Sequence, residues 1–380
     1  MRKAALLALV LLVAASLVVL SVGTSHAITS KKCWLCHTMH NSQDNASMML
    51  QYRDSTAGTG GDVPQGALIR FVGCAGCHIA GTAGSDTVVD DTPIVYHVGG
   101  YPVANVLAGG DFYYANQTPA KGHNSKGVAP LEAMAPPGFT AATRPAAYGG
   151  SGAWGPATWA SQSASTQLSC AGEYGCHGDR STGRDDFGGV RGAHHANGTL
   201  TTAQVCDGTT VAKSYRFLGG IKGVEQDNGI MDSWERQVDA SKHNGYYGIK
   251  RGSDTDTTAT ISFLCAECHG NFHSAAGIGT TSPWIRHPTD IAFSSAVGAE
   301  FQSSNPSRYA TYDPIVPVGW TPTEIASGTP TNGMPADPVV LCLSCHRAHG
   351  TPYNDLVRWE YAEGGDQPAT HSCRTCHVGK

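Results

Sequence analysis

The chain has few charged residues, 14% of its 380 positions, and no stretch with the sustained periodicity of a long helix or of alternating strands. These absences argue against an ordinary globular domain built on amphipathic helices or regular sheets. Glycine and proline are abundant instead, with 47 and 20 copies. We therefore expect a mostly irregular or coil fold with short helices and few strands, and little conventional hydrophobic core.

A long apolar run is also absent beyond the N-terminus, so no later segment is predicted to cross a membrane. Arg2 and Lys3 precede an apolar stretch from Ala4 to Val22, and Ser25-His26-Ala27 resembles a cleavage site. We interpret residues 1–27 as a secretory signal peptide and residues 28–380 as a single exported domain. The alternative is a retained anchor, because Ala4 to Val22 is nearly long enough to span a bilayer.

An excess of positive charge is missing as well, since the formal net charge is −5. Nucleic acid and anionic lipid surfaces attract basic proteins, so neither is a predicted partner. After signal cleavage we also expect no membrane insertion.

Cysteine is plentiful, and its spacing is informative. Random order at this composition, 13 Cys and 17 His, would give about 0.02 copies of Cys-x-x-Cys-His. The chain contains five of them, at 33–37, 74–78, 265–269, 342–346 and 373–377. This spacing is typical of covalent haem attachment in c-type cytochromes and predicts a multihaem electron carrier.

The motif has a chemical reason. Two thiols three positions apart can add to the two vinyl groups of one porphyrin, and the following histidine is then the proximal iron ligand. Zinc is the alternative for paired cysteines, but it does not need a histidine after every second one. The predicted thioether cysteines are Cys33, Cys36, Cys74, Cys77, Cys265, Cys268, Cys342, Cys345, Cys373 and Cys376. The predicted proximal ligands are His37, His78, His269, His346 and His377.

A sixth, irregular site is predicted at Cys170 to His177, where five residues separate the cysteines. Cys176-His177 keeps the usual ending, so His177 is a further predicted proximal ligand. Two variants remain open. Either Cys170 and Cys176 both bond the haem across a widened loop, or Cys176 bonds it alone while Cys170 forms a disulfide with Cys206. A third possibility is that no haem binds here.

Each haem iron needs a second axial ligand, and histidines outside the motifs are numerous enough to supply all of them. The candidates are His40, His97, His123, His194, His195, His243, His273, His287, His349 and His371. Methionine is a less favoured alternative. Full bis-histidine coordination would leave no position for a substrate, so we predict electron transfer and not enzymatic catalysis.

Three motifs carry another histidine shortly after the proximal one, at His40, His273 and His349. Three or four residues cannot reach around a planar macrocycle to its opposite face. We therefore predict that each of these histidines ligates a different haem, which would hold neighbouring haems close together. We also expect a short helical turn after the first motif, over residues 41–52.

Blocks around the motifs resemble the OmcS-like family of filament-forming hexahaem outer-surface c-type cytochromes. They lie in order along most of the mature chain, at 36–42, 96–98, 109–112, 121–124, 215–220, 286–288 and 342–349. The first and last blocks are specific, and the glycine-rich ones are weak.

The resemblance implies six bis-histidine haems c in a continuous chain, wrapped by a mostly irregular polypeptide. It implies distal roles for His97, His123, His273, His287 and His349. It further implies that His40 ligates the haem at 342–346 in a neighbouring copy, which would give a head-to-tail homopolymer. The third site departs from the family, because the histidine expected just after it is missing while His195 and His243 are present.

The expected location is extracellular or on the outer cell surface, with the periplasm as the alternative. Upstream outer-membrane or periplasmic cytochromes are the expected electron donors, and the acceptor is extracellular. Two rival functions remain: a monomeric periplasmic electron shuttle, and a multihaem reductase of a small oxyanion, which would need an iron with an exchangeable position.

Overall fold

The computed structural model describes only part of the chain. The described residues are 42–43, 46–47, 73–80, 88–89, 92–103, 106–131, 135–139, 166–181, 183–190, 195, 204–225, 243–250, 254, 256–273, 287–295, 309, 311–327, 333–361 and 371–377. The predicted signal peptide, the first motif and His40 lie outside them.

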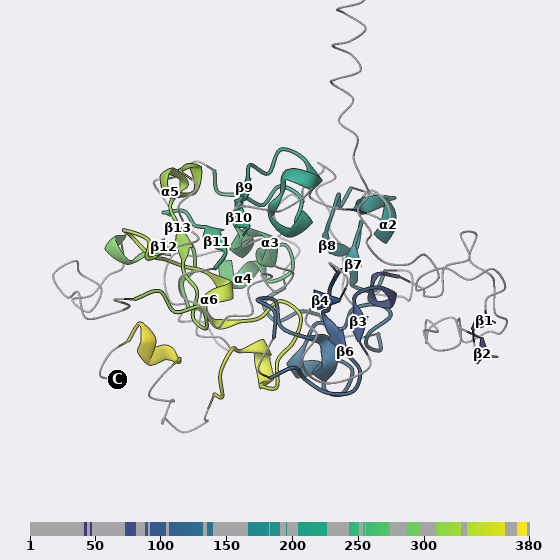
Figure 1. Ribbon diagram of the computed structural model, residues 1–380. Coiled ribbons are helices and arrows are strands. Elements are labelled where there is room, and N and C mark those ends of the chain that lie inside the picture. Colours follow the sequence, from purple (N-terminus) through teal and green to yellow (C-terminus); the bar gives the residue numbers. More distant parts are fainter. Residues whose placement is uncertain are drawn as a thin grey trace, which may run out of the picture.

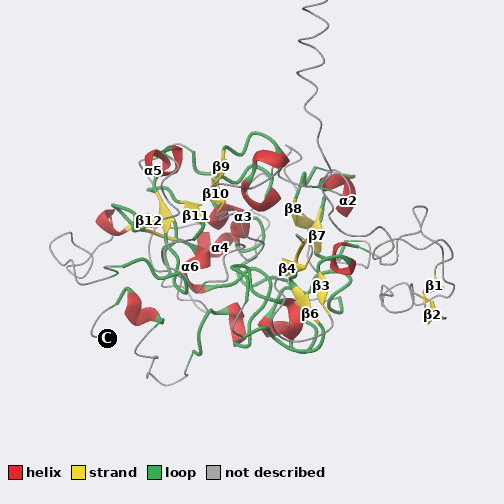
Figure 2. Ribbon diagram, in the orientation of Figure 1, coloured by secondary structure: helices red, strands yellow, loops and turns green. Residues whose placement is uncertain are grey.

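The secondary structure is short and scattered, as expected for a chain so rich in glycine and proline (Figure 2). The longest described α-helix has 6 residues. The described α-helices are α2 (Asp186–Gly189), α3 (Ile261–Ala266), α4 (Gly270–His273), α5 (Pro322–Ala326) and α6 (Cys342–Cys345). The described 3-10 helices are η3 (Cys74–Gly76), η4 (Phe112–Tyr114), η5 (Pro119–Lys121), η8 (Val211–Lys213), η9 (Tyr215–Phe217), η10 (Phe293–Ser295), η12 (Asn354–Leu356) and η13 (Cys373–Thr375). The predicted fold class, mostly coil with short helices and few strands, is confirmed.

The strands in the described part of the chain are two or three residues long. They are β1 (Ser42–Gln43), β2 (Ala46–Ser47), β3 (Ile79–Ala80), β4 (Val88–Val89), β5 (Thr92–Pro93), β6 (Tyr96–His97), β7 (Ser169–Ala171), β8 (Gly175–His177), β9 (Gln204–Cys206), β10 (Gly223–Glu225), β11 (Gly245–Tyr247), β12 (Ile291–Ala292), β13 (Gly319–Trp320) and β14 (Val339–Val340). The expectation of a helical turn over 41–52 is wrong for its described residues, 42–43 and 46–47, because β1 and β2 pair there as antiparallel strands; the rest of the segment lies outside the described residues. Asp44 and Asn45 separate the two strands, and these residue types favour tight hairpin turns over helix.

One mixed sheet of six strands, in the order β12-β14-β13-β11-β10-β9, organises the C-terminal two thirds of the described structure. Consecutive residues of a strand point to opposite faces, so Tyr246 and Tyr247 enter different clusters. Tyr246 belongs to the cluster of Ile221 and Leu341. Tyr247 belongs to the cluster of Trp320 and of Ile325 in α5. This sheet is the nearest feature to a conventional core.

The motif-bearing segments lie beside and below this sheet region. In Figure 1, β3, β6, β7 and β8 lie together at the right, β9 to β13 lie to their left, α3 lies near the centre, and α6 lies below β11. α3 packs against α4 and α6, so the fourth and fifth motifs are neighbours. Among the described residues, no helix has the length and apolar character needed to traverse a bilayer.

Candidate haem sites

Four regular motifs lie in the described residues, and each folds as a single helical turn. In each turn the backbone N–H of the motif histidine donates to the carbonyl of the first cysteine. The distances are 3.1 Å at His78, 2.9 Å at His269, 3.0 Å at His346 and 2.8 Å at His377. Residues three apart share one face of such a turn, so the two thiols lie side by side.

Most of the predicted proximal histidines contact main-chain carbonyls. Nδ1 of four of them lies 2.7 to 2.8 Å from a carbonyl oxygen: His78 to Pro93, His177 to Arg216, His269 to Pro137 and His346 to Asp355. A carbonyl only accepts, so Nδ1 must carry the proton and Nε2 keeps its lone pair. A hydrogen bond at the other ring nitrogen fixes metal-binding imidazoles in this same orientation.

Four proximal histidines face a second histidine at a recurring separation. The ring centroids are 6.1 Å apart for His78 and His195, 6.4 Å for His177 and His349, 6.2 Å for His269 and His123, and 6.1 Å for His377 and His287. Metal–imidazole bonds of about 2 Å on each side would place two ring centroids roughly 6 Å apart. The donor sets therefore fit one bis-histidine iron each.

Two of the facing histidines have a main-chain anchor of their own. Nδ1 of His123 donates to the carbonyl of Ala348 at 2.6 Å, and Nδ1 of His287 donates to that of Pro288 at 2.9 Å. Both rings thus present Nε2 as the lone-pair nitrogen, as the proximal rings do.

Burial favours the uncharged form of two of these imidazoles, those of His269 and His349. Desolvation by the surrounding protein lowers the pKa of His269 to about 4 and the pKa of His349 to about 3. A neutral imidazole is the form that binds a metal, so no proton has to be displaced at neutral pH.

His349 depends on a close approach of two backbone segments. Its N–H donates to the carbonyl of Gly109 at 2.7 Å, and a Cβ on Gly109 would lie 2.9 Å from its Nδ1. At Gly110 the φ is +84° and a Cβ would lie 2.2 Å from the carbonyl oxygen of Gly350. The glycine pair in the 109–112 block therefore positions His349.

Gly110→Ala is expected to destabilise the protein by more than about 2 kcal/mol, because a left-handed conformation and a backbone clash act together. Gly183→Ala is the matched control, since Gly183 has a φ of +83° with nothing within 4 Å of the added Cβ. The control should cost about 1–2 kcal/mol through its φ alone. Denaturant midpoints compare the two, and equal losses would show that the approach to Gly350 is unimportant.

His97 is held by a carboxylate instead of a carbonyl. Its ring is fully buried, and its Nδ1 lies 2.6 Å from Oδ2 of Asp111, which is 1% exposed. The Asp111 side chain also accepts from the backbone N–H of His97 and of Tyr113, so its position is fixed. The geometry suits a ligand histidine, and the distal role of His97 stays a prediction.

Two other predicted distal histidines have Nε2 engaged by protein. His243 lies in a buried site between two carbonyl acceptors, with Nδ1 2.9 Å from the carbonyl oxygen of Asn244 and Nε2 3.2 Å from that of Gly333. Its ring also stacks on Tyr312 at 3.5 Å. His273 places Nε2 2.7 Å from Oδ2 of Asp290. The distal role of His243 stays a prediction, and a ligand role for His273 would require its other nitrogen.

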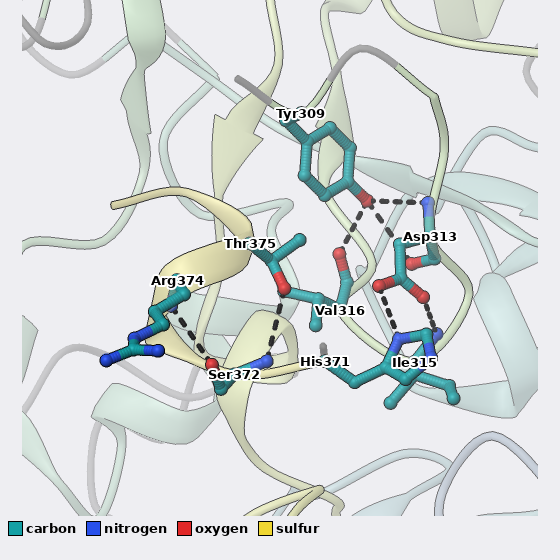
Figure 3. A network of polar contacts seen from close by, with 8 residues as sticks. All are labelled: Tyr309, Asp313, Ile315, Val316, His371, Ser372, Arg374 and Thr375. Atoms are coloured by element: carbon teal, nitrogen blue, oxygen red, sulfur yellow. Dashed lines mark hydrogen bonds and ion pairs between the residues drawn. The ribbon is translucent and has the colours of Figure 1, made fainter. Parts of the chain in front are cut away.

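His371 lies just before the sixth motif, in the polar network of Figure 3. Its Nδ1 lies 2.8 Å from Oδ2 of Asp313, whose Oδ1 accepts from the backbone N–H of Ile315 at 2.9 Å. The hydroxyl of Tyr309 donates to the carbonyl of Val316 at 2.5 Å. This network connects the sixth motif to the 309–316 segment. The predicted role of His371 as an iron ligand stays a prediction.

Cysteines of successive motifs also meet. Cys74 and Cys170 lie within hydrogen-bonding distance of each other, as do Cys265 and Cys342. The second and third sites are thus neighbours, and so are the fourth and fifth.

A buried ion pair that sequence reasoning missed links the third and fourth sites. Arg180 Nη2 lies 2.8 Å from Oε1 of Glu267, and the two side chains are 1% and 2% exposed. Arg180 also donates to the carbonyl of Gly219 at 3.2 Å. Glu267 occupies a variable position inside the fourth motif, where the spacing rule says nothing about residue type.

The zinc alternative finds no support in the geometry. Across the ranges given above, no group of three or more His, Cys, Asp or Glu side chains is arranged to bind a bare metal ion. Pairs of imidazoles with adjacent thiols fit haem better than a tetrahedral metal site. Cys33, Cys36, His37, His40 and His194 lie outside the described residues, so their predicted roles stay predictions.

Comparison with known proteins agrees with the sequence blocks. No family model matches the chain. The sequence is 24% identical to the C-type cytochrome OmcS of Geobacter sulfurreducens over 398 residues, covering 92% of this chain and 84% of that protein. The predicted resemblance to OmcS is confirmed: the sequence is OmcS-like along nearly all of its length.

Two solved structures are similar more loosely. The outer membrane cytochrome S filament from Geobacter sulfurreducens gives a TM-score of 0.37 at 15% identity, covering 89% of this chain and 85% of that one. The OmcS nanowires from Geobacter sulfurreducens, seen by cryo-EM, give a TM-score of 0.40 at 19% identity, covering 86% and 83%. At these scores the likeness of the backbones decides nothing about this chain.

Proposed function

We propose that this chain is an exported multihaem c-type cytochrome that carries electrons and has no substrate chemistry of its own. In this proposal residues 28–380 form one domain that holds six haems c, each between two imidazoles. Copies join head to tail into a filament outside the cell, which receives electrons from upstream cytochromes and delivers them to an extracellular acceptor.

The observation that carries the proposal is the recurrence of imidazole pairs whose separation would let both rings bind one iron between them. At four motifs the proximal histidine faces a second histidine at 6.1 to 6.4 Å. We assign the distal ligands accordingly: His195 to the site of His78, His349 to that of His177, His123 to that of His269 and His287 to that of His377. His349 is three residues from His346 yet faces His177 of another motif, as expected if three residues cannot reach the opposite face of the haem bound at His346.

The bound haems would supply one-electron oxidation and reduction. The chain's own residues do the rest: carbonyls opposite Nδ1 hold six of the rings in one orientation, and burial lowers the pKa of His269 and His349. Imidazole on both sides favours low reduction potentials, because methionine is the ligand that raises them. Saturated irons have no exchangeable position, and this feature separates the proposal from a reductase.

Assembly into a filament rests on the similarity to OmcS. Solved structures describe that protein as a filament. We propose that His40 of one copy ligates the haem at 342–346 of the next, as the resemblance around both blocks implies. Such a contact is heterologous and does not close on itself, so it propagates. A monomeric periplasmic shuttle would use the same sites without this contact.

Purification from cells tests the proposal directly. We expect a pyridine haemochrome assay to give six haems per chain, and the ferric paramagnetic resonance spectrum to contain low-spin signals alone. Electron microscopy of sheared material should show filaments that His40→Ala abolishes while leaving five low-spin haems. Tight carbon monoxide binding by the reduced wild type would favour a reductase, and a fully ligated monomer would favour the shuttle.

A further inference from the structure

The widened motif from Cys170 to His177 differs from the others in its backbone, yet its histidine is placed like theirs. Nδ1 of His177 donates to the carbonyl of Arg216 at 2.8 Å, and its ring centroid lies 6.4 Å from that of His349. The regular motifs of His78 and His269 show the same two features. The iron-binding half of this site is therefore equivalent to that of a regular motif.

The five intervening residues form a closed loop. The N–H of Gly172 donates to the carbonyl of His177 at 3.1 Å, and the N–H of Gly175 donates to that of Gly172 at 3.0 Å. Gly172 has a φ of +79°, and a Cβ there would lie 2.5 Å from the carbonyl oxygen of Asp185. The loop is compact, so the extra residues do not push the two cysteines apart.

Strand pairing then brings the two cysteines together. β7 and β8 are parallel, with Ser169 opposite Gly175 and Ala171 opposite His177. This register puts Cys170 level with Cys176. Paired strands are about 5 Å apart, and residues three apart on a helical turn are separated by roughly 5–6 Å between Cβ atoms. The two thiols of the widened motif thus have a spacing comparable to that of a regular one.

The neighbours of Cys170 identify which cysteine it stands for. Cys170 lies beside Cys74, the first cysteine of the second motif, and Cys265 lies beside Cys342, the first cysteines of the fourth and fifth motifs. Cys74, Cys265 and Cys342, the cysteines of regular motifs in these two contacts, are each the first cysteine of their motif. Cys170 therefore occupies the position of the first haem-binding cysteine.

Cys206 is engaged elsewhere. It is 1% exposed in the core cluster with Tyr215 and Ile221, and it contacts Glu225 across the β9–β10 pair. It forms no disulfide with Cys170.

We propose that Cys170 and Cys176 both form thioethers with one haem, making Cys-x5-Cys-His the third attachment motif, while Cys206 takes no part in covalent attachment. This inference rests on the proposed function and adds the attachment chemistry of one site. Each thiol adds across one vinyl group: the sulfur bonds to carbon and its hydrogen goes to the other vinyl carbon. No electrons are gained or lost, so the product has the summed mass of peptide and haem.

Mass spectrometry of proteolytic fragments of the holoprotein tests the inference. The fragment with residues 170–177 should carry one haem at the summed mass, with neither cysteine alkylated after reduction, and Cys206 should be alkylated. Cys170→Ala should leave a haem bound by one thioether, and its pyridine haemochrome band should move to longer wavelength because one vinyl stays conjugated. The matched control Cys206→Ala should change neither the haem count nor the band.

Three results would overturn it: an alkylated Cys170 in the wild type, a Cys170–Cys206 disulfide, or a haem-free fragment. The wild-type fragment map decides the matter even if Cys170→Ala fails to fold. Failure here is distinguishable from failure of the proposed function, since the five regular motifs would still carry haem in the same map.

Discussion

Arg180→Met is expected to lower the free energy of unfolding by about 3–5 kcal/mol, because it leaves the Glu267 carboxylate buried without a counter-charge. The pair is 2.8 Å apart and almost completely shielded from water. It also joins the loop after the third motif to the turn of the fourth, so the loss should loosen both sites together. Guanidinium unfolding followed by Soret circular dichroism measures the effect.

Arg184→Met is the matched control, four residues away in the same loop. Arg184 pairs with Asp179 at 3.0 Å, but its side chain is 54% exposed. Exposed pairs contribute about 0–1 kcal/mol, so the control should change little. The double variant Arg180→Met with Glu267→Met should regain much of the lost stability, because both charges are then gone. If Arg180→Met and Arg184→Met lowered the free energy of unfolding equally, the buried Arg180–Glu267 pair would not be the source of the effect.

His349→Ala should convert one haem of the protein from low-spin to high-spin. His349 faces His177 at a centroid separation of 6.4 Å, so its loss would leave the iron of the third site with a single protein ligand. We expect a new high-spin ferric resonance of one iron per chain, and binding of one carbon monoxide by the reduced form. Both are absent from the proposed wild type.

His243→Phe provides the comparison. His243 is fully buried and stacked on Tyr312, and both of its nitrogens face carbonyls. Phenylalanine keeps the stacking and removes the hydrogen bonds, so we expect lower stability with all haems still low-spin. High-spin iron in His243→Phe, together with an unchanged His349→Ala, would reverse the two assignments.

Local pattern predicted the attachment motifs and the fold class, because both depend on neighbouring residues. Cys-x-x-Cys-His needs one helical turn, and the four described regular motifs form it. Scarce periodicity predicted the absence of long elements, which the 6-residue α3 illustrates. The hairpin of β1 and β2 shows the limit: a short segment such as 41–52 lacks enough positions to distinguish a turn of helix from paired strands.

Ligand pairing was beyond the reach of local pattern. His78 faces His195, and His177 faces His349. These pairs are far apart in the sequence, and local patterns in a single sequence do not predict which distant segments come together. The Gly109–Gly110 approach to His349 is likewise visible only once both segments are in place. A histidine count gave enough candidates for each site but could not distinguish His195, which faces His78, from His243, whose two nitrogens face carbonyls.

The pairing of His177 with His349 has a consequence for biosynthesis. If the chain is exported from its N-terminus, as proposed above, His177 arrives near the middle of translocation and His349 only close to the end. A haem loaded early at the third site would therefore wait with one imidazole while half the polypeptide is still arriving. Truncation near the C-terminus should then remove the second ligand of the haem at the third site, which lies in the middle of the sequence. Chains with an incompletely ligated haem would also be present in the receiving compartment during every round of synthesis.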